Sequence, residues 1–218
     1  SGSAIGDLDN DGNKEIVTAV WASSGNGGQV IVTNHDGSNY GTTITFSGAE
    51  KPKAPVLGDV DNNGDLEIVV STDTKTYVYN YNGTLLSGWP KTTSSGLYLP
   101  TTSLADIDGN GDLEIFVTGG KNTTHYGDPG YTIYGFHHDG TFIQNWPIQV
   151  PNGIWMWTTP IIGDIDSDNQ VEILVGSPGC YLRAYNLDGS LVSGYPVQLF
   201  NTDIKCTINQ IDLVNLGF

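Results

Sequence analysis

Asp106-Ile-Asp-Gly-Asn-Gly-Asp-Leu-Glu114 is the fullest example of a pattern that this 218-residue chain repeats four times. The other copies are Asp7-Leu-Asp-Asn-Asp-Gly-Asn-Lys-Glu15, Asp59-Val-Asp-Asn-Asn-Gly-Asp-Leu-Glu67 and Asp164-Ile-Asp-Ser-Asp-Asn-Gln-Val-Glu172. Each copy runs into a short apolar stretch, and the copies start 52, 47 and 58 residues apart. Self-similarity at such a spacing is typical of repeat architectures. The sequence therefore predicts four copies of one structural unit, and we number their nine-residue acidic loops 1 to 4 in chain order.

Side-chain oxygens stand at the same positions of every acidic loop, which predicts a metal site in each. Oxygens at alternate positions of a tight loop converge on one hard cation, a backbone carbonyl at position 7 adds another ligand, and Ca²⁺ takes roughly 6–8 oxygens. The Glu closes the loop at position 9 instead of the later position used by an EF-hand, which favours a loop inside a β-hairpin. The candidate ligands are Asp7, Asp9, Asp11, Asn13 and Glu15; Asp59, Asp61, Asn63, Asp65 and Glu67; Asp106, Asp108, Asn110, Asp112 and Glu114; and Asp164, Asp166, Asp168, Gln170 and Glu172.

The alternative is a set of plain Asp-Gly or Asn-Gly turns whose acids are only solvated. Position 6 needs a sharp turn in either case, and Gly12, Gly64 and Gly111 tolerate a positive φ there, with Asn169 in loop 4. Four copies with the same ligand positions favour the metal site, because three or four carboxylates crowded without a cation would repel one another. We therefore predict about four bound Ca²⁺ ions.

Composition agrees with a folded, metal-binding protein. The formal net charge is −16, from 24 acidic and 8 basic residues, and the hydrophobic content is 38%. Four Ca²⁺ ions would offset half of that charge. The acidity argues against a nucleic-acid partner, which would need basic patches. No apolar run approaches the length of a membrane-spanning helix.

Each repeat has the pattern of four short strands, and no helical periodicity stands out. An apolar strand leads into the acidic loop, a second strand follows it, a third carries alternating aromatics, and an Asp-Gly or Asn-Gly turn precedes the fourth. Three repeats end in an aromatic residue followed by Pro, at Trp89, Trp146 and Tyr195, which we interpret as packing between repeats instead of ligand stacking. We predict an all-β fold: a β-propeller of four-stranded antiparallel blades at 1–48, 52–93, 99–149 and 157–199.

The Asp-x-Asp-x-Asp/Asn-Gly-x-x-Glu loop followed by a β-run resembles the FG-GAP/VCBS repeat family, the blades of integrin α-subunit heads and of many bacterial secreted proteins. The Asp-Gly turn and the Gly-Trp-Pro ending resemble the bacterial secreted branch. The resemblance covers essentially the whole chain. It implies one Ca²⁺ between the first two strands of each blade, all on one face of the disc, and an extracellular or cell-surface location. A fold of this kind does not fix a function.

The C-terminal segment 203–218 looks like the first strand of a further blade, but the acidic pattern is lost after Asp212. Two architectures remain open: part of a larger ring, which we favour, or a small ring closed by this last strand. The two cysteines, Cys180 and Cys206, are either a disulfide or two small buried residues.

The sequence leaves three classes of function open. We favour a non-catalytic adhesion or binding module for a glycan or an extracellular protein, since no nucleophile, phosphate-loop or zinc-protease motif is present. The alternatives are a structural subunit of a stalk or filament, with neighbouring domains or self-assembly, and part of a Ca²⁺-dependent polysaccharide lyase. The candidate ligand-binding residues are Trp155, Trp157, Tyr126 and His125. We expect His35, His137 and His138, at or beside turns, to be exposed to solvent.

Overall fold

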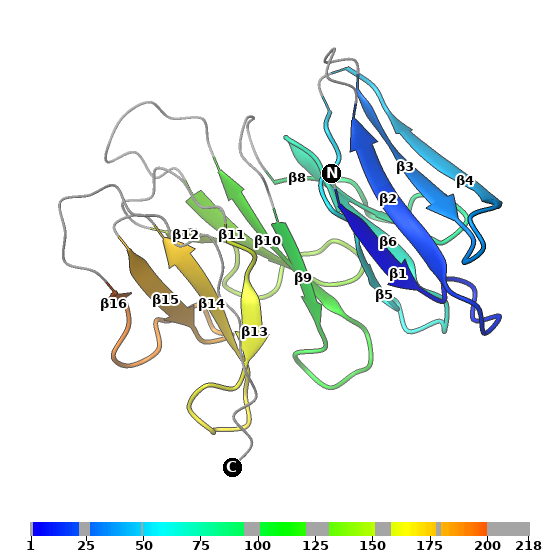
Figure 1. Cartoon of the computed structure of the whole chain (residues 1–218). Coiled ribbons are helices and arrows are strands. Elements are labelled where there is room, and N and C mark those ends of the chain that lie inside the picture. Colours follow the sequence, from blue (N-terminus) through cyan, green and yellow to red (C-terminus); the bar gives the residue numbers. More distant parts are fainter. Residues whose placement is uncertain are drawn as a thin grey trace.

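The computed structural model describes residues 2–21, 27–48, 50–93, 101–120, 131–150, 158–177 and 180–199. Within these ranges the regular structure is β-strand, and the strands form four antiparallel sheets of four strands each. The strands of every sheet pair in sequence order, so each repeat forms one up-and-down sheet. Figure 1 shows the sheets following one another from the blue N-terminal sheet to the brown C-terminal one. The prediction of an all-β fold with four-stranded antiparallel units is confirmed.

We number the sheets 1 to 4 in chain order. Sheet 1 contains β1 (Ser3–Gly6), β2 (Glu15–Trp21), β3 (Gly28–Thr33) and β4 (Asn39–Phe46). Sheet 2 contains β5 (Val56–Gly58), β6 (Glu67–Ser71), β7 (Lys75–Tyr79) and β8 (Lys91–Thr92). Sheet 3 contains β9 (Thr101–Ala105), β10 (Glu114–Gly120), β11 (Tyr131–Phe136) and β12 (Ile148–Val150). Sheet 4 contains β13 (Ile161–Gly163), β14 (Glu172–Ser177), β15 (Tyr181–Tyr185) and β16 (Val197–Gln198).

The core lies between neighbouring sheets. One buried cluster joins Val17 and Val30 of sheet 1 to Ile68 and Val70 of sheet 2, and further clusters join sheet 2 to sheet 3 and sheet 3 to sheet 4. The second strands of sheets 2 and 4 are buried along their whole length. A strand covered on both faces needs a continuous apolar run, which is why the residues after each acidic loop are β-branched and aromatic instead of alternating.

The first strands bring the acidic loops to one edge of the molecule. β1 contacts β5, β5 contacts β9, and β9 contacts β13, so the four first strands are neighbours. Each runs in the same sense and ends in its acidic loop, and all four loops lie along the lower edge in Figure 1. The described ranges contain no helix that is long and apolar enough to cross a bilayer.

In sheets 2, 3 and 4 the paired fourth strand lies later in the sequence than predicted, whereas in sheet 1 β4 follows the Asp36-Gly37 turn as expected. The stretches after the Asp-Gly and Asn-Gly turns make only isolated bridges to the third strand, at Leu85, Phe142 and Leu191. The chain then turns, with Gly88 and Gly194 at φ 89° and 90°, and the paired fourth strand begins only after the proline. The turns themselves have the expected glycine geometry, with φ of 82° at Gly83 and 75° at Gly140.

The aromatic residues before the prolines fasten two of the sheets to their neighbours. Trp89 is 6% exposed, and its Nε1–H donates to the His138 carbonyl of sheet 3 at 2.8 Å. Trp146 is 5% exposed and donates in the same way to the Leu187 carbonyl of sheet 4 at 2.9 Å. The packing interpretation is confirmed for both indoles, because a buried ring is not available for ligand stacking. Tyr195 is half-buried.

Cys180 is buried and disulfide-bonded, with φ of 60°. The second cysteine of the chain, at position 206, lies outside the described residues, as does the strand predicted at 203–218. The predicted blade boundaries also fall partly in undescribed segments and stay a prediction.

Candidate metal centres

The first aspartate of each acidic loop holds the loop in shape. In loop 2, Asp59 accepts backbone hydrogen bonds from Asn63 at 2.9 Å and from Gly64 at 3.0 Å. Asp7 of loop 1 accepts from Asp11 and Gly12 at 3.0 and 2.9 Å. The same carboxylate therefore closes the turn from inside, and this explains why an acid stands at the first position even before a metal is considered.

The closing glutamate of every loop is buried and anchored through one oxygen. Its Oε2 accepts the backbone N–H of the second loop residue, at 2.9 Å from Leu8, 2.8 Å from Val60, 3.0 Å from Ile107 and 2.8 Å from Ile165. The four glutamates are between 0 and 2% exposed. Since one oxygen is fixed by the backbone, the other is left to face the loop.

Among the described residues, three buried carboxylate oxygens have no hydrogen-bond partner: Oδ1 of Asp9, Oδ1 of Asp61 and Oε1 of Glu67. A charged oxygen without a partner in a buried position is costly, and the group then either takes up a proton or binds a cation. Burial raises the pKa of Glu67 to about 7, and the charges of Asp61 and Asp59 act in the same direction. Burial also raises the pKa of Glu172. An all-oxygen set with unsatisfied charge fits a hard dication such as Ca²⁺.

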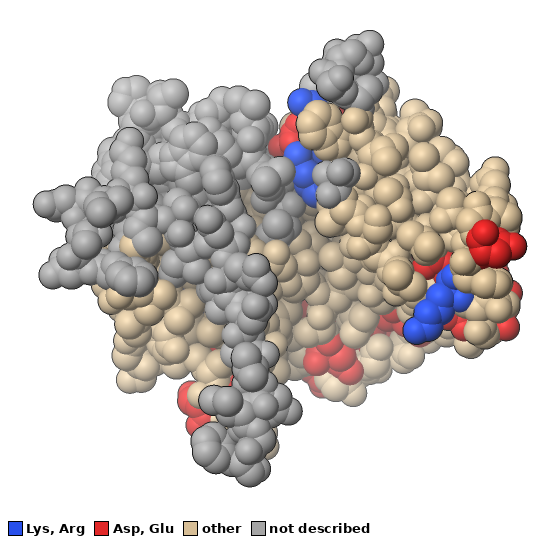
Figure 2. Space-filling view, viewed as in Figure 1, with Lys and Arg blue, Asp and Glu red and all other residues tan. Residues whose placement is uncertain are grey.

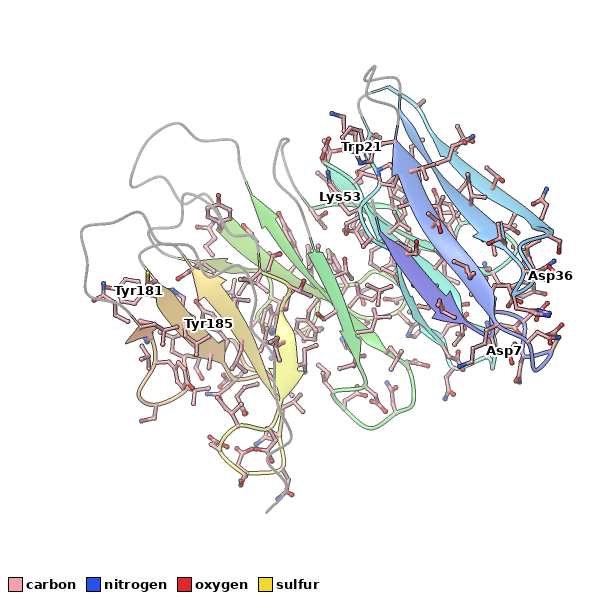
Figure 3. All side chains as sticks on the ribbon, in the orientation of Figure 1. Asp7, Trp21, Asp36, Lys53, Tyr181 and Tyr185 are labelled. Carbon is pink, nitrogen blue, oxygen red and sulfur yellow. The ribbon has the colours of Figure 1, made fainter. Side chains whose placement is uncertain are left out.

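In each loop three side chains bring one ligand atom apiece within 4.8 Å of one another. In loops 1, 2 and 4 these are the residues at positions 1, 3 and 9. They are Asp7, Asp9 and Glu15; Asp59, Asp61 and Glu67; and Asp164, Asp166 and Glu172. In loop 3 the group is Asp108, Glu114 and His137. Figure 2 shows acidic residues gathered along the lower edge, and Figure 3 places Asp7 there.

The residues at positions 5 and 7 are arranged differently from the three that converge. Asp11, Asn63, Asn110 and Asp168 at position 5 each accept the backbone N–H of position 7, at 2.7, 2.8, 2.6 and 2.7 Å. Among the position 7 side chains, Asn13 and Gln170 donate to the residue at position 5. Asp112 instead lies 2.9 Å from His138 Nδ1. Asp65 and the other residues of positions 5 and 7 stay predicted ligands, as does Asp106.

Neighbouring loops are joined through their backbones. The N–H of Leu66 in loop 2 donates to the carbonyl of Leu8 in loop 1 at 3.0 Å, and Leu113 of loop 3 donates to Val60 of loop 2 at 3.1 Å. Gly111 lies so close to Asn62 that an added Cβ would stand 2.4 Å from its side-chain nitrogen. The first three loops are therefore joined to one another through backbone hydrogen bonds.

His137 was missed by the sequence reasoning, which expected an exposed turn residue. Its side chain is 36% exposed, and its Nδ1 lies 3.2 Å from Oε1 of Glu114. The expectation of solvent exposure is confirmed for His35, whereas His138 is only partly exposed and its Nδ1 lies 2.9 Å from Asp112. The sequence does contain one indication of this contact. His137 directly follows the third strand, and in an antiparallel pair that position lies opposite the start of the second strand, where Glu114 stands.

The four candidate ligand-binding residues, Trp155, Trp157, Tyr126 and His125, lie outside the described residues. The proposal that they bind a glycan or a protein therefore stays a prediction. The described residues instead bring together the candidate metal ligands of the acidic loops.

Loop 2 offers a test of which side chains bind the ion. We expect Asp61→Ala to lower the number of Ca²⁺ ions bound per chain by one, because it removes a buried oxygen that has no other partner. Asp65→Ala is the matched control, since position 7 is expected to contribute only its backbone carbonyl. Calorimetric stoichiometry measures both. Loss of an ion in Asp65→Ala with none lost in Asp61→Ala would show that the register of the ligands is wrong.

Comparison with known proteins identifies both the repeats and the fold. The profile of FG-GAP-like repeats matches residues 7–70 and 106–175, which together are more than half of the chain and include all four acidic loops. None of the curated proteins compared with the chain matches it.

Several solved structures are similar in fold. BBS1N in complex with ARL6DN matches with a TM-score of 0.55 at 14% identity, over 88% of this chain and 54% of that one. The V. cholerae biofilm matrix protein Bap1 has a TM-score of 0.48 at 18% identity, over 91% of this chain and 39% of its own. The exotype rhamnogalacturonan lyase YesX has a TM-score of 0.46 at 16% identity, over 89% of this chain and 46% of that one. The chain thus spans about half or less of the length of each.

Proposed function

The chain belongs to the FG-GAP-like repeat family, and we propose that it is a non-catalytic, Ca²⁺-binding module that works outside the cell and binds a glycan or a protein. The observation that carries the metal-binding part is the set of buried carboxylate oxygens without partners in loops 1 and 2. Backbone amides hold the carboxylates in place on the edge of a packed β-scaffold. Such an arrangement suits an ion that fastens a surface loop.

The extracellular assignment rests on the chemistry of the loops. Positions 4 to 6 of each loop are exposed or only half-buried, and each converging group has three side chains. An open site with few charged ligands binds Ca²⁺ weakly, and modules outside the cell work with dissociation constants of about 10⁻⁴ to 10⁻³ M. Millimolar Ca²⁺ outside the cell would keep such loops filled, whereas the much lower cytosolic concentration would not.

The test is binding to glycan and extracellular-protein arrays in millimolar Ca²⁺ and again in EGTA. We expect signals that EGTA abolishes, because emptying the loops loosens the scaffold that positions the connections at the other end of the strands. Release of shortened products from an acidic polysaccharide would instead identify a lyase. Filaments seen by electron microscopy, with no array signal, would identify a structural subunit.

A further inference from the structure

One position outside the acidic loops faces each closing glutamate. Glu15 begins β2 and Asn34 follows β3, and the pairing of Ile16 with Thr33 places these two residues opposite each other. The pairing of Ile68 with Tyr79 and of Ile173 with Tyr185 gives the same relation in sheets 2 and 4. The facing residues are Asn34, Asn80, His137 and Asn186. Only sheet 3 has an imidazole at this position.

Each of the three asparagines donates across the turn that follows its third strand. Their Nδ2 atoms donate to the hydroxyls of Ser38, Thr84 and Ser190 at 2.8, 3.0 and 2.9 Å. The position nevertheless borders the metal loop. In sheet 4, Asn186 lines an open cavity of about 400 Å³ together with Asp166, Asp168 and Glu172. A side chain here can therefore either support the turn or enter the site.

The side chain of His137 enters the site. Its Nδ1 lies 3.2 Å from Oε1 of Glu114, the atom that corresponds to the partnerless Oε1 of Glu67 in loop 2. Asp108 completes a group whose ligand atoms lie within 4.8 Å of one another. Since a carboxylate oxygen only accepts, the Nδ1–H of His137 donates to Glu114 when no metal is present.

We propose that loop 3 differs from the other loops in its metal: Asp108, Glu114 and His137 bind a borderline transition ion of the Zn²⁺ class, whereas loops 1, 2 and 4 bind Ca²⁺. This inference rests on the metal-binding role proposed for the loops. It goes beyond that role by separating one site from the other three, through a residue that the loop pattern does not contain.

The donor atoms of this group favour a transition ion over Ca²⁺. Ca²⁺ takes oxygen ligands, and an imidazole nitrogen in place of one of them favours Zn²⁺ and related ions. Two ligands of a tetrahedral Zn²⁺ at 2.0–2.1 Å stand about 3.3 Å apart, and the Nδ1 to Oε1 distance is 3.2 Å. Three protein ligands leave a position for water, as in open zinc sites. The ion takes the place of the Nδ1 proton: a neutral imidazole changes to its Nε2–H tautomer without net proton release, whereas an imidazolium passes one proton to solvent.

The experiment titrates Zn²⁺ into the full chain, freed of any purification tag and saturated with Ca²⁺, and follows heat and stoichiometry. We expect one Zn²⁺ per chain in the wild type. His137→Asn, which installs the residue found in the other three sheets, should lose this site or weaken it by at least about tenfold. Co²⁺ as a second probe should give a visible absorption band in the wild type that the variant lacks.

His138→Asn is the matched control, because it removes the neighbouring imidazole, which pairs with Asp112 outside the group. It should keep the Zn²⁺ site. Equal Zn²⁺ binding by wild type and His137→Asn, or equal loss in both variants, would overturn the assignment. Ca²⁺ is counted in the same samples: three or four Ca²⁺ with no Zn²⁺ contradict this inference alone, whereas no bound Ca²⁺ also contradicts the proposed function.

Discussion

Removing Ca²⁺ should lower the melting temperature of this protein substantially. An ion that binds only the folded loops stabilises the native state by about 1.4 kcal/mol per site at a free concentration about ten times its dissociation constant. For a cooperative unit of this size, that corresponds to roughly 3–6 °C for each filled site. The gain should be large because the carboxylates of each loop repel one another when the loop is empty, and because three of their oxygens are buried without partners. Thermal melts in millimolar Ca²⁺ and in EGTA measure the difference.

The size of this effect should increase with pH. Burial raises the pKa of Glu67 to about 7, so the metal-free native state holds a proton that the unfolded chain releases at lower pH. The native state binds more protons than the unfolded state between about pH 4.5 and 7, and its metal-free stability therefore falls as the pH rises through that range. Ca²⁺ needs the ionised carboxylate and gains affinity over the same range. We expect the stabilisation by Ca²⁺ to be larger at pH 8 than at pH 5.5.

Mg²⁺ at the same concentration is the control for simple screening of the net charge of −16. It screens that charge equally well, but it demands near-octahedral geometry and keeps its waters. We expect Mg²⁺ to recover only a small part of the Ca²⁺ effect. Equal melting temperatures in Ca²⁺ and EGTA, or equal stabilisation by the two ions, would contradict the presence of Ca²⁺ sites in the loops.

The repeat period and the acidic loops could be predicted from sequence because both are local. Asp59 and Glu67 are eight residues apart, and their carboxylates close the loop by accepting hydrogen bonds from its backbone N–H groups. The apolar run after each loop also predicted the second strand of each repeat. These features depend on neighbouring residues, so the sequence carries them without knowledge of the tertiary structure.

The fourth strands and His137 could not be predicted in the same way. The short apolar stretch around Leu85 follows the turn directly, but the turn at Gly88 moves the paired strand to the residues after the proline. His137 reaches Glu114 across 23 residues, through the register of β10 with β11. Both depend on pairing between segments, and a repeat pattern by itself does not state which atoms face each other across a pair.

Trp89→Ala should destabilise the protein strongly. The indole is 6% exposed and belongs to the buried cluster that joins sheets 2 and 3. Its ring meets Phe136 edge to face with centroids 5.4 Å apart, and its Nε1–H satisfies the carbonyl of His138. Truncating a buried Trp to Ala costs about 3–5 kcal/mol through lost transfer free energy and the cavity that remains. Denaturant unfolding monitored by circular dichroism measures the loss.

Two further variants separate the contributions to that loss. Trp89→Phe keeps an aromatic ring against Phe136 but leaves the His138 carbonyl without its donor, which should cost about 1–3 kcal/mol. Tyr195→Ala changes the equivalent residue of sheet 4, which is only half-buried, and should therefore cost less than Trp89→Ala because less apolar area is removed from contact. If Trp89→Ala unfolded at the wild-type denaturant concentration, sheets 2 and 3 would not be held together by this indole. A loss in Trp89→Phe as large as in Trp89→Ala would assign the effect to the hydrogen bond instead of the buried ring.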